Sequence, residues 1–97
     1  MILTEEQLER IREMGALFLS PHEVACLIGV EGSDRETFLE QFYPESDAPA
    51  YRAWKLGYTQ SKYEIRKKVV SLAKMGSPQA EMLAEKYIEE LEIDRNV

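Results

Sequence analysis

The side chains that could carry chemistry in this sequence are few and scattered. The single histidine, His22, and the single cysteine, Cys26, are four residues apart, so on one helix they would share a face with the spacing of two metal ligands. A metal site needs at least three protein ligands, and the chain has no other histidine or cysteine. No grouping of serine, histidine and aspartate indicates a nucleophile. We therefore interpret the pair as a helix-start histidine and a buried thiol, and predict a protein that is not an enzyme, with no catalytic residue, metal or cofactor.

Charge is unevenly distributed along the 97 residues, whose net charge is −6. Residues 1–46 hold 3 basic and 10 acidic side chains, residues 47–76 hold 7 and 2, and residues 77–97 hold 2 and 6. Four of the central cations fall near one polar face of a helix: Arg52, Lys55, Lys62 and Arg66. This basic face is predicted to follow the backbone of double-stranded DNA, or else to meet the acidic faces of the first or last helix, in the same chain or in a neighbouring copy.

Helix start and stop signals organise the whole chain. Capping boxes are predicted at Thr4/Gln7, Ser20/Glu23 and Ser33/Glu36, and prolines stand at the first position of later helices. These signals predict helices over residues 4–19, 20–28, 33–42, 49–75 and from 77 to a frayed tail near 94, with Pro44 ending the third, Ser46 or Asp47 capping the fourth, and Gly57 bending or breaking it. The predicted fold class is all-α, with about five helices and no strand.

Residues 20–42 have the pattern of a helix-turn-helix. Ala25 and Gly29 allow two helices to cross closely, and Val30 fills the space behind the turn. The outer face of the second helix would then enter a major groove, where three residues are candidates for reading bases: Arg35, Thr37 and Gln41. The acidic neighbours of these residues oppose binding to phosphates. A tri-helical packing unit without a role in DNA binding is the alternative.

The long helix carries an apolar row near the 3.5-residue spacing of a coiled-coil seam: Tyr51, Trp54, Tyr58, Ile65, Val69 and Leu72. A second row of Leu56, Tyr63 and Val70 widens the stripe beyond what one neighbouring helix covers. We therefore predict homo-oligomerisation through this face. The predicted organisation is a helix-turn-helix unit over 1–46 and an oligomerisation segment over 47–97, packed together as one compact unit.

Across residues 16–91 the chain resembles the small terminase subunits of tailed phages and prophages. The resemblance rests on the helix-turn-helix and on a following pattern that includes Ala50, Tyr51, Gly57, Ile65, Ala73, Gly76, Ser77, Ala80 and Leu83. It implies a viral DNA-packaging protein in the bacterial host that binds the packaging-initiation site, forms a ring and regulates a separate large subunit with ATPase and nuclease activities. The acidic character of residues 33–42 departs from this pattern.

Three functions remain open from the sequence. The first is a DNA-binding, oligomerising adaptor of the terminase small-subunit type. The second is a protein interaction and self-assembly module with a vestigial helix-turn-helix, and the third is a small dimeric transcriptional regulator. No apolar run approaches the ~20 residues that cross a membrane, so we expect a cytoplasmic protein without a membrane partner.

Overall fold

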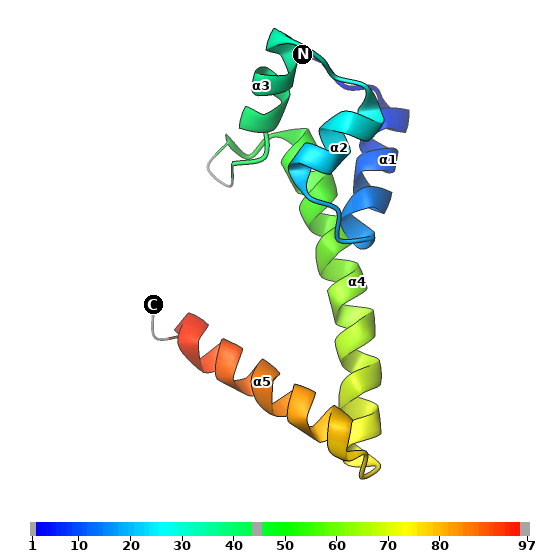
Figure 1. Ribbon diagram of the computed structural model, residues 1–97, viewed down its shortest axis with the longest axis vertical. Helices are drawn as coiled ribbons and strands as arrows, with labels where there is room; N and C mark the ends of the chain where they lie inside the picture. Colours follow the sequence, from blue (N-terminus) through cyan, green and yellow to red (C-terminus); the bar gives the residue numbers. More distant parts are fainter. Residues whose placement is uncertain (1, 44–45, 96–97) are drawn as a thin grey trace. The chain divides into compact units, whose positions relative to one another are not determined.

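The computed structural model describes residues 2–43 and 46–95, and the regular elements in these ranges are all α-helices (Figure 1). The helices are α1 (Glu5–Ala16), α2 (Pro21–Ile28), α3 (Ser33–Glu40), α4 (Pro49–Lys74) and α5 (Pro78–Arg95). The prediction of an all-α fold with about five helices is confirmed.

The chain divides into two compact units, Met1–Ser61 (unit 1) and Lys62–Val97 (unit 2). Unit 1 contains α1, α2, α3 and the first half of α4, whereas unit 2 contains the rest of α4 and α5. The sequence placed its boundary between residues 46 and 47. The structural boundary lies inside α4, because Ala50, Ala53 and Trp54 of this helix belong to the same hydrophobic cluster as α1, α2 and α3.

Two of the three predicted capping boxes are present. The Gln7 amide donates to the Thr4 hydroxyl, the Thr4 amide donates to the Gln7 side chain, and Ser20 and Glu23 form the same reciprocal pair. The third box is wrong. Gly32 occupies the capping position of α3 with φ 63° and ψ −139°, so Ser33 is already the first helical residue and its side chain forms no cap hydrogen bond.

Two helices end earlier than predicted. The first, α1, ends at Ala16 rather than Leu19, because Phe18 takes a left-handed backbone conformation with φ 62° and its amide donates to the Gly15 carbonyl. The third, α3, ends at Glu40 rather than residue 42. Pro44, which was expected to end it, lies outside the described residues.

The start of α4 differs from the prediction as well. The helix begins at Pro49, and the Arg52 amide donates to the Ala48 carbonyl. The Ser46 hydroxyl donates instead to the carbonyls of Gln41 and Tyr43, both at 2.8 Å. Ser46 therefore stabilises the turn after α3.

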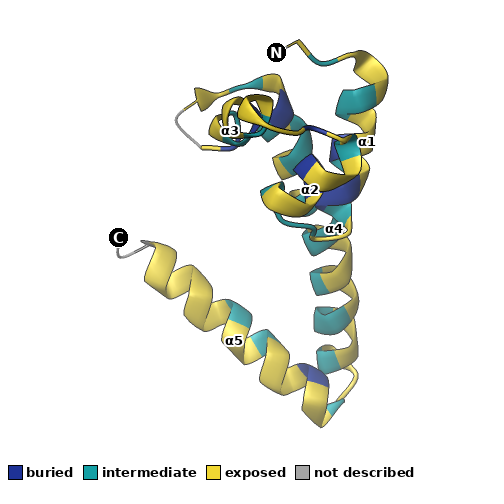
Figure 2. Ribbon diagram, turned by 45° about the horizontal axis from the view of Figure 1, so that its top comes forward, coloured by how far each residue is buried: buried dark blue, intermediate teal, exposed yellow. Residues whose placement is uncertain are grey.

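The core of unit 1 forms where α1, α2, α3 and the start of α4 meet (Figure 2). Phe38, Ile11 and Val24 are the largest side chains that are fully buried, and Ala25 and Ala50 are also fully enclosed. Burying a large apolar side chain stabilises a fold by about 1.5–3 kcal/mol. Ala25, the small residue of the helix-turn-helix pattern, is therefore part of this core.

Two glycines allow α1 and α4 to lie in backbone contact. A Cβ atom on Gly15 would overlap the Trp54 carbonyl oxygen, and a Cβ atom on Gly57 would overlap the Arg12 carbonyl oxygen. Helix α4 continues through Gly57, so the expected break there is wrong. The Trp54 indole Nε1 donates to the Leu19 carbonyl over 2.8 Å and fixes the same crossing.

Unit 2 is a helical hairpin with little buried surface. Gly76 lies in the turn between the helices with φ 97°, and Ala80 is buried at 5% exposure. Arg66 Nη2 donates to Glu90 Oε2 over 2.6 Å, and its guanidinium lies 4.1 Å from the centre of the Tyr87 ring. The two helices are thus joined by an ion pair and a cation–π contact across a thin apolar layer.

Candidate nucleic-acid interface and assembly surface

The three residues predicted to read bases do not form one exposed surface. Thr37 is exposed on α3, but Arg35 is half-buried and its Nη2 donates to the Cys26 sulfur at 3.5 Å. Gln41 follows the end of α3, is half-buried, and lines a small hollow with Leu3 and Leu8. Of the three candidates for direct readout, Thr37 alone is exposed on α3, whereas Arg35 is half-buried and Gln41 lies beyond the last helical residue.

The exposed surface of α3 is instead acidic. Asp34, Glu36 and Glu40 are all exposed. Their carboxylates repel phosphate groups, and phosphate contacts supply much of the affinity for DNA. A duplex would therefore meet α3 with an unfavourable electrostatic interaction.

The possible metal-ligand pair lies on the surface of α2. His22 and Cys26 are both exposed, so the expectation of a buried thiol is wrong. Within residues 2–43 and 46–95, no group of three or more histidine, cysteine, aspartate or glutamate side chains is placed to hold a metal ion.

The four predicted backbone-tracking cations divide between the two units. Arg52 and Lys55 are exposed in unit 1, where Arg52 Nε lies 3.8 Å from Asp47 Oδ1 and Lys55 Nζ lies 5.1 Å from the centre of the Tyr58 ring. Lys62 and Arg66 are half-buried in unit 2. Since Arg66 pairs with Glu90, this cation meets the last helix of its own chain, which was the alternative reading of the basic face.

The predicted oligomerisation row also divides at the unit boundary. Trp54 stacks on Tyr58 at 5.6 Å between ring centres and meets the edge of Phe42 at 6.2 Å, while Tyr51 lies 6.4 Å from Trp54. These three aromatic residues of α4 are half-buried inside unit 1. In unit 2, by contrast, Ile65 and Leu72 remain exposed and Val69 is half-buried.

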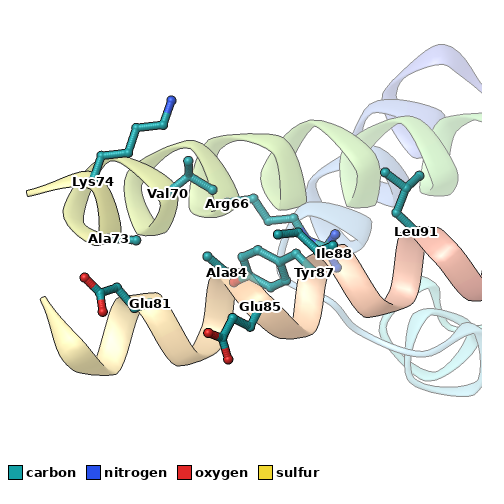
Figure 3. A pocket seen from close by; sticks show the side chains of 10 residues that line it. All are labelled: Arg66, Val70, Ala73, Lys74, Glu81, Ala84, Glu85, Tyr87, Ile88 and Leu91. Carbon is teal, nitrogen blue, oxygen red and sulfur yellow. The ribbon is translucent and has the colours of Figure 1, made fainter. Parts of the chain in front are cut away.

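The sequence placed α5 within the predicted oligomerisation segment over 47–97 but identified no assembly residue on it. In unit 2, α4 and α5 line a hollow of about 660 Å³ whose apolar side chains include Val70, Ile88 and Leu91 (Figure 3). Ile88 and Leu91 are each 57% exposed. The three-residue spacing of these two was visible in the sequence, but only the hairpin sets them beside Val70.

In the part of the chain that the structure describes, none of the helices combines the length and the apolar character that crossing a membrane requires.

Comparison of the chain with protein-family models, with curated protein sequences and with solved structures finds no match.

Proposed function

We propose that this protein is a non-catalytic adaptor that assembles with copies of itself through unit 2 and holds double-stranded DNA through exposed cations of α4. This is the role of a terminase small subunit in viral DNA packaging, with a large ATPase and nuclease subunit as its protein partner in the bacterial cytoplasm.

The observation that carries the proposal is the apolar surface of unit 2. Exposed large apolar side chains occur on both helices of unit 2 and in the turn between them: Tyr63, Ile65, Leu72, Met75, Met82, Leu83, Ile88, Leu91 and Ile93. Apolar side chains that are exposed in groups rather than singly mark protein interaction sites in soluble proteins. This arrangement fits an adaptor that assembles through unit 2 and leaves unit 1 accessible to another partner.

The DNA contact is proposed for α4 rather than α3. Exposed cations of α4 that lie outside the hollow of unit 2 include Arg52, Lys55 and Lys67. Cations that contact phosphates bind with little sequence preference and release condensed counterions. We therefore expect binding that depends strongly on salt and weakly on base sequence.

The test is fluorescence anisotropy of a labelled duplex over a range of salt concentrations. Each lost phosphate contact lowers the slope of log K against log [salt] by about 1. In the Arg52→Gln/Lys55→Gln variant, the magnitude of this slope should fall by up to about 2, and the variant should bind every duplex more weakly than the wild type does. Lys86→Gln on the exposed surface of α5 is the matched control and should bind as the wild type does.

A second candidate function is a self-assembly module without a nucleic-acid partner. It is favoured by the acidic surface of α3 and by the Arg66–Glu90 pair, which uses one of the candidate cations inside unit 2. If the wild type assembles but binds no duplex at low salt, this second function is supported and the DNA-binding adaptor is excluded. A strict dimer that binds one duplex with strong sequence preference would favour the transcriptional regulator.

A further inference from the structure

The hollow of unit 2 is lined by apolar side chains of both helices, together with two glutamates of α5 and Lys74 near the end of α4 (Figure 3). We call this surface the groove and define it by the apolar residues Val70, Ala84 and Ile88, by Lys74 on α4, and by Glu81 and Glu85 on α5. Its shape and composition suit an apolar ridge that is flanked by charge.

The same hairpin carries a second apolar surface that does not line the groove. We call it the ridge and define it by Ile65 and Leu72 on α4 and Leu83 on α5, which are 48%, 43% and 42% exposed. Ile65 and Leu72 are seven residues apart, which places both on one side of their helix.

Helix geometry puts the groove and the ridge on opposite sides of the hairpin. Ile65 precedes Val70 by five residues and Leu83 precedes Ile88 by five residues. Five residues turn an α-helix by about 140°. Because the two helices run in opposite directions in the hairpin, the two rotations carry both ridge positions to the side away from the groove.

From this arrangement we infer that the ridge of one copy packs into the groove of a second copy. The charges agree with this occupant, since Lys68 lies between Ile65 and Leu72 on α4 and would approach the glutamates of the partner's groove. Within the described residues, Lys68, Glu81 and Glu85 form no ion pair of their own. The inference rests on the proposed self-assembly and adds which two surfaces meet.

Two different surfaces on opposite sides make the contact heterologous, so each copy has two distinct neighbours. Such a contact propagates into a closed ring or an open filament, whereas an isologous contact stops at a dimer. The buried centre of the contact would consist of Leu72 and Ile88, the kind of apolar anchors that dominate interface energies.

Complementation between two blocked variants tests the inference in the full-length chain. Ile88→Glu blocks the groove and Leu72→Glu blocks the ridge, and sedimentation velocity reports the size of each species. We expect the wild type to exceed a dimer, each variant alone to be monomeric, and an equimolar mixture to form a heterodimer and nothing larger. Ser71→Glu introduces the same charge at an exposed position of α4 outside both surfaces and should assemble as the wild type does.

Other outcomes overturn the inference in recognisable ways. If one variant still self-associates while the other does not, the contact is isologous, and the proposed assembly stands without the groove and ridge pairing. If the wild type is monomeric at high concentration, the assembly half of the proposed function fails too. If the wild type assembles but does not bind a duplex, the DNA-binding half of the proposed function fails and the assembly half stands.

A disulfide experiment removes the risk that a buried charge unfolds the hairpin. In a Cys26→Ser background, Leu72→Cys and Ile88→Cys are prepared separately, and circular dichroism checks their helicity. Mild oxidation of the mixture should give mainly the mixed disulfide dimer, whereas Leu72→Cys mixed with Met82→Cys should not. Equal yields from the two mixtures would refute the pairing.

Discussion

Gly57 shows how a residue without a side chain decides where two helices cross. In an isolated helix, glycine destabilises by about 1 kcal/mol relative to alanine. In this fold it is buried against the backbone of α1, where a Cβ atom would overlap the Arg12 carbonyl. The cost in helix propensity is therefore offset by the close packing of α1 on α4.

Replacing this glycine should consequently destabilise unit 1. We expect Gly57→Ala to lower the free energy of unfolding by about 1–3 kcal/mol, the usual range for overpacked sites. Denaturant unfolding followed by the fluorescence of Trp54, the single tryptophan, measures the change. Thr59→Ala, at an exposed position of the same helix, should stay within about 0.5 kcal/mol. A Gly57→Ala protein as stable as the control would contradict the close crossing.

Among the elements, α2 and α3 begin with similar sequences but use them differently. Ser20 precedes its helix with an extended backbone and accepts from the Glu23 amide. Ser33 has the same spacing to a glutamate but is already helical, because Gly32 takes the capping position with a positive φ. Glycine reaches that conformation at little steric cost, so the helix gains one residue and loses its side-chain cap.

Alanine substitutions at the two serines should therefore differ. Ser20→Ala removes a cap and should cost about 1 kcal/mol of stability. Ser33→Ala removes no cap hydrogen bond and should leave stability unchanged or slightly raised, since alanine has the higher helix propensity. Thermal unfolding by circular dichroism compares the two variants, and equal losses would reinstate the third capping box.

The box of α2 also makes this element sensitive to acid. The Ser20 amide donates to Glu23 Oε1 over 2.9 Å, and this hydrogen bond lowers the pKa of Glu23. A lowered pKa in the folded state gives stability that is present above the unfolded-state pKa of about 4.3 and is lost as the pH falls through the folded value.

We expect Glu23→Gln to keep the box, as Gln7 does in α1, and to reduce the loss of melting temperature between pH 5 and pH 3. Melting curves at each pH check this, with Glu31→Gln as the control for the charge change. Parallel profiles for the wild type and Glu23→Gln would show that the box does not contribute to acid sensitivity.

At the scale of the whole molecule, the two units differ in how they are stabilised. Unit 1 encloses a contiguous core, whereas among the described residues of unit 2 Ala80 is the buried apolar residue. Two helices without a substantial core are marginal in water. Assembly that buries the apolar surface of unit 2 would supply the missing stability.

Thermal stability should therefore depend on protein concentration, because assembly stabilises the folded state by mass action. We expect the transition seen by circular dichroism, which reports the helices of both units, to rise with concentration. The transition seen by Trp54 fluorescence, which reports unit 1, should change less. Leu72→Glu should remove the concentration dependence, and wild-type transitions that do not change with concentration would contradict the proposed assembly.

The sequence by itself determined the elements, because caps, prolines and glycines act on the backbone within a few residues. The all-α class, the boxes at Thr4 and Ser20 and the turn at Gly76 all follow from such local interactions. Ala25, which the helix-turn-helix pattern assigned to a close approach of two helices, is fully buried.

Only the tertiary structure decided what each helix face meets. Periodicity shows which side chains share a helix face. A coiled-coil spacing does not show whether the helix that packs on this face belongs to the same chain or to another copy. Trp54 and Ile65 belong to one row, yet the first packs inside unit 1 and the second remains exposed. Arg35 points to Cys26 and Arg66 to Glu90 for the same reason, since these partners are distant in sequence and only folding brings them together.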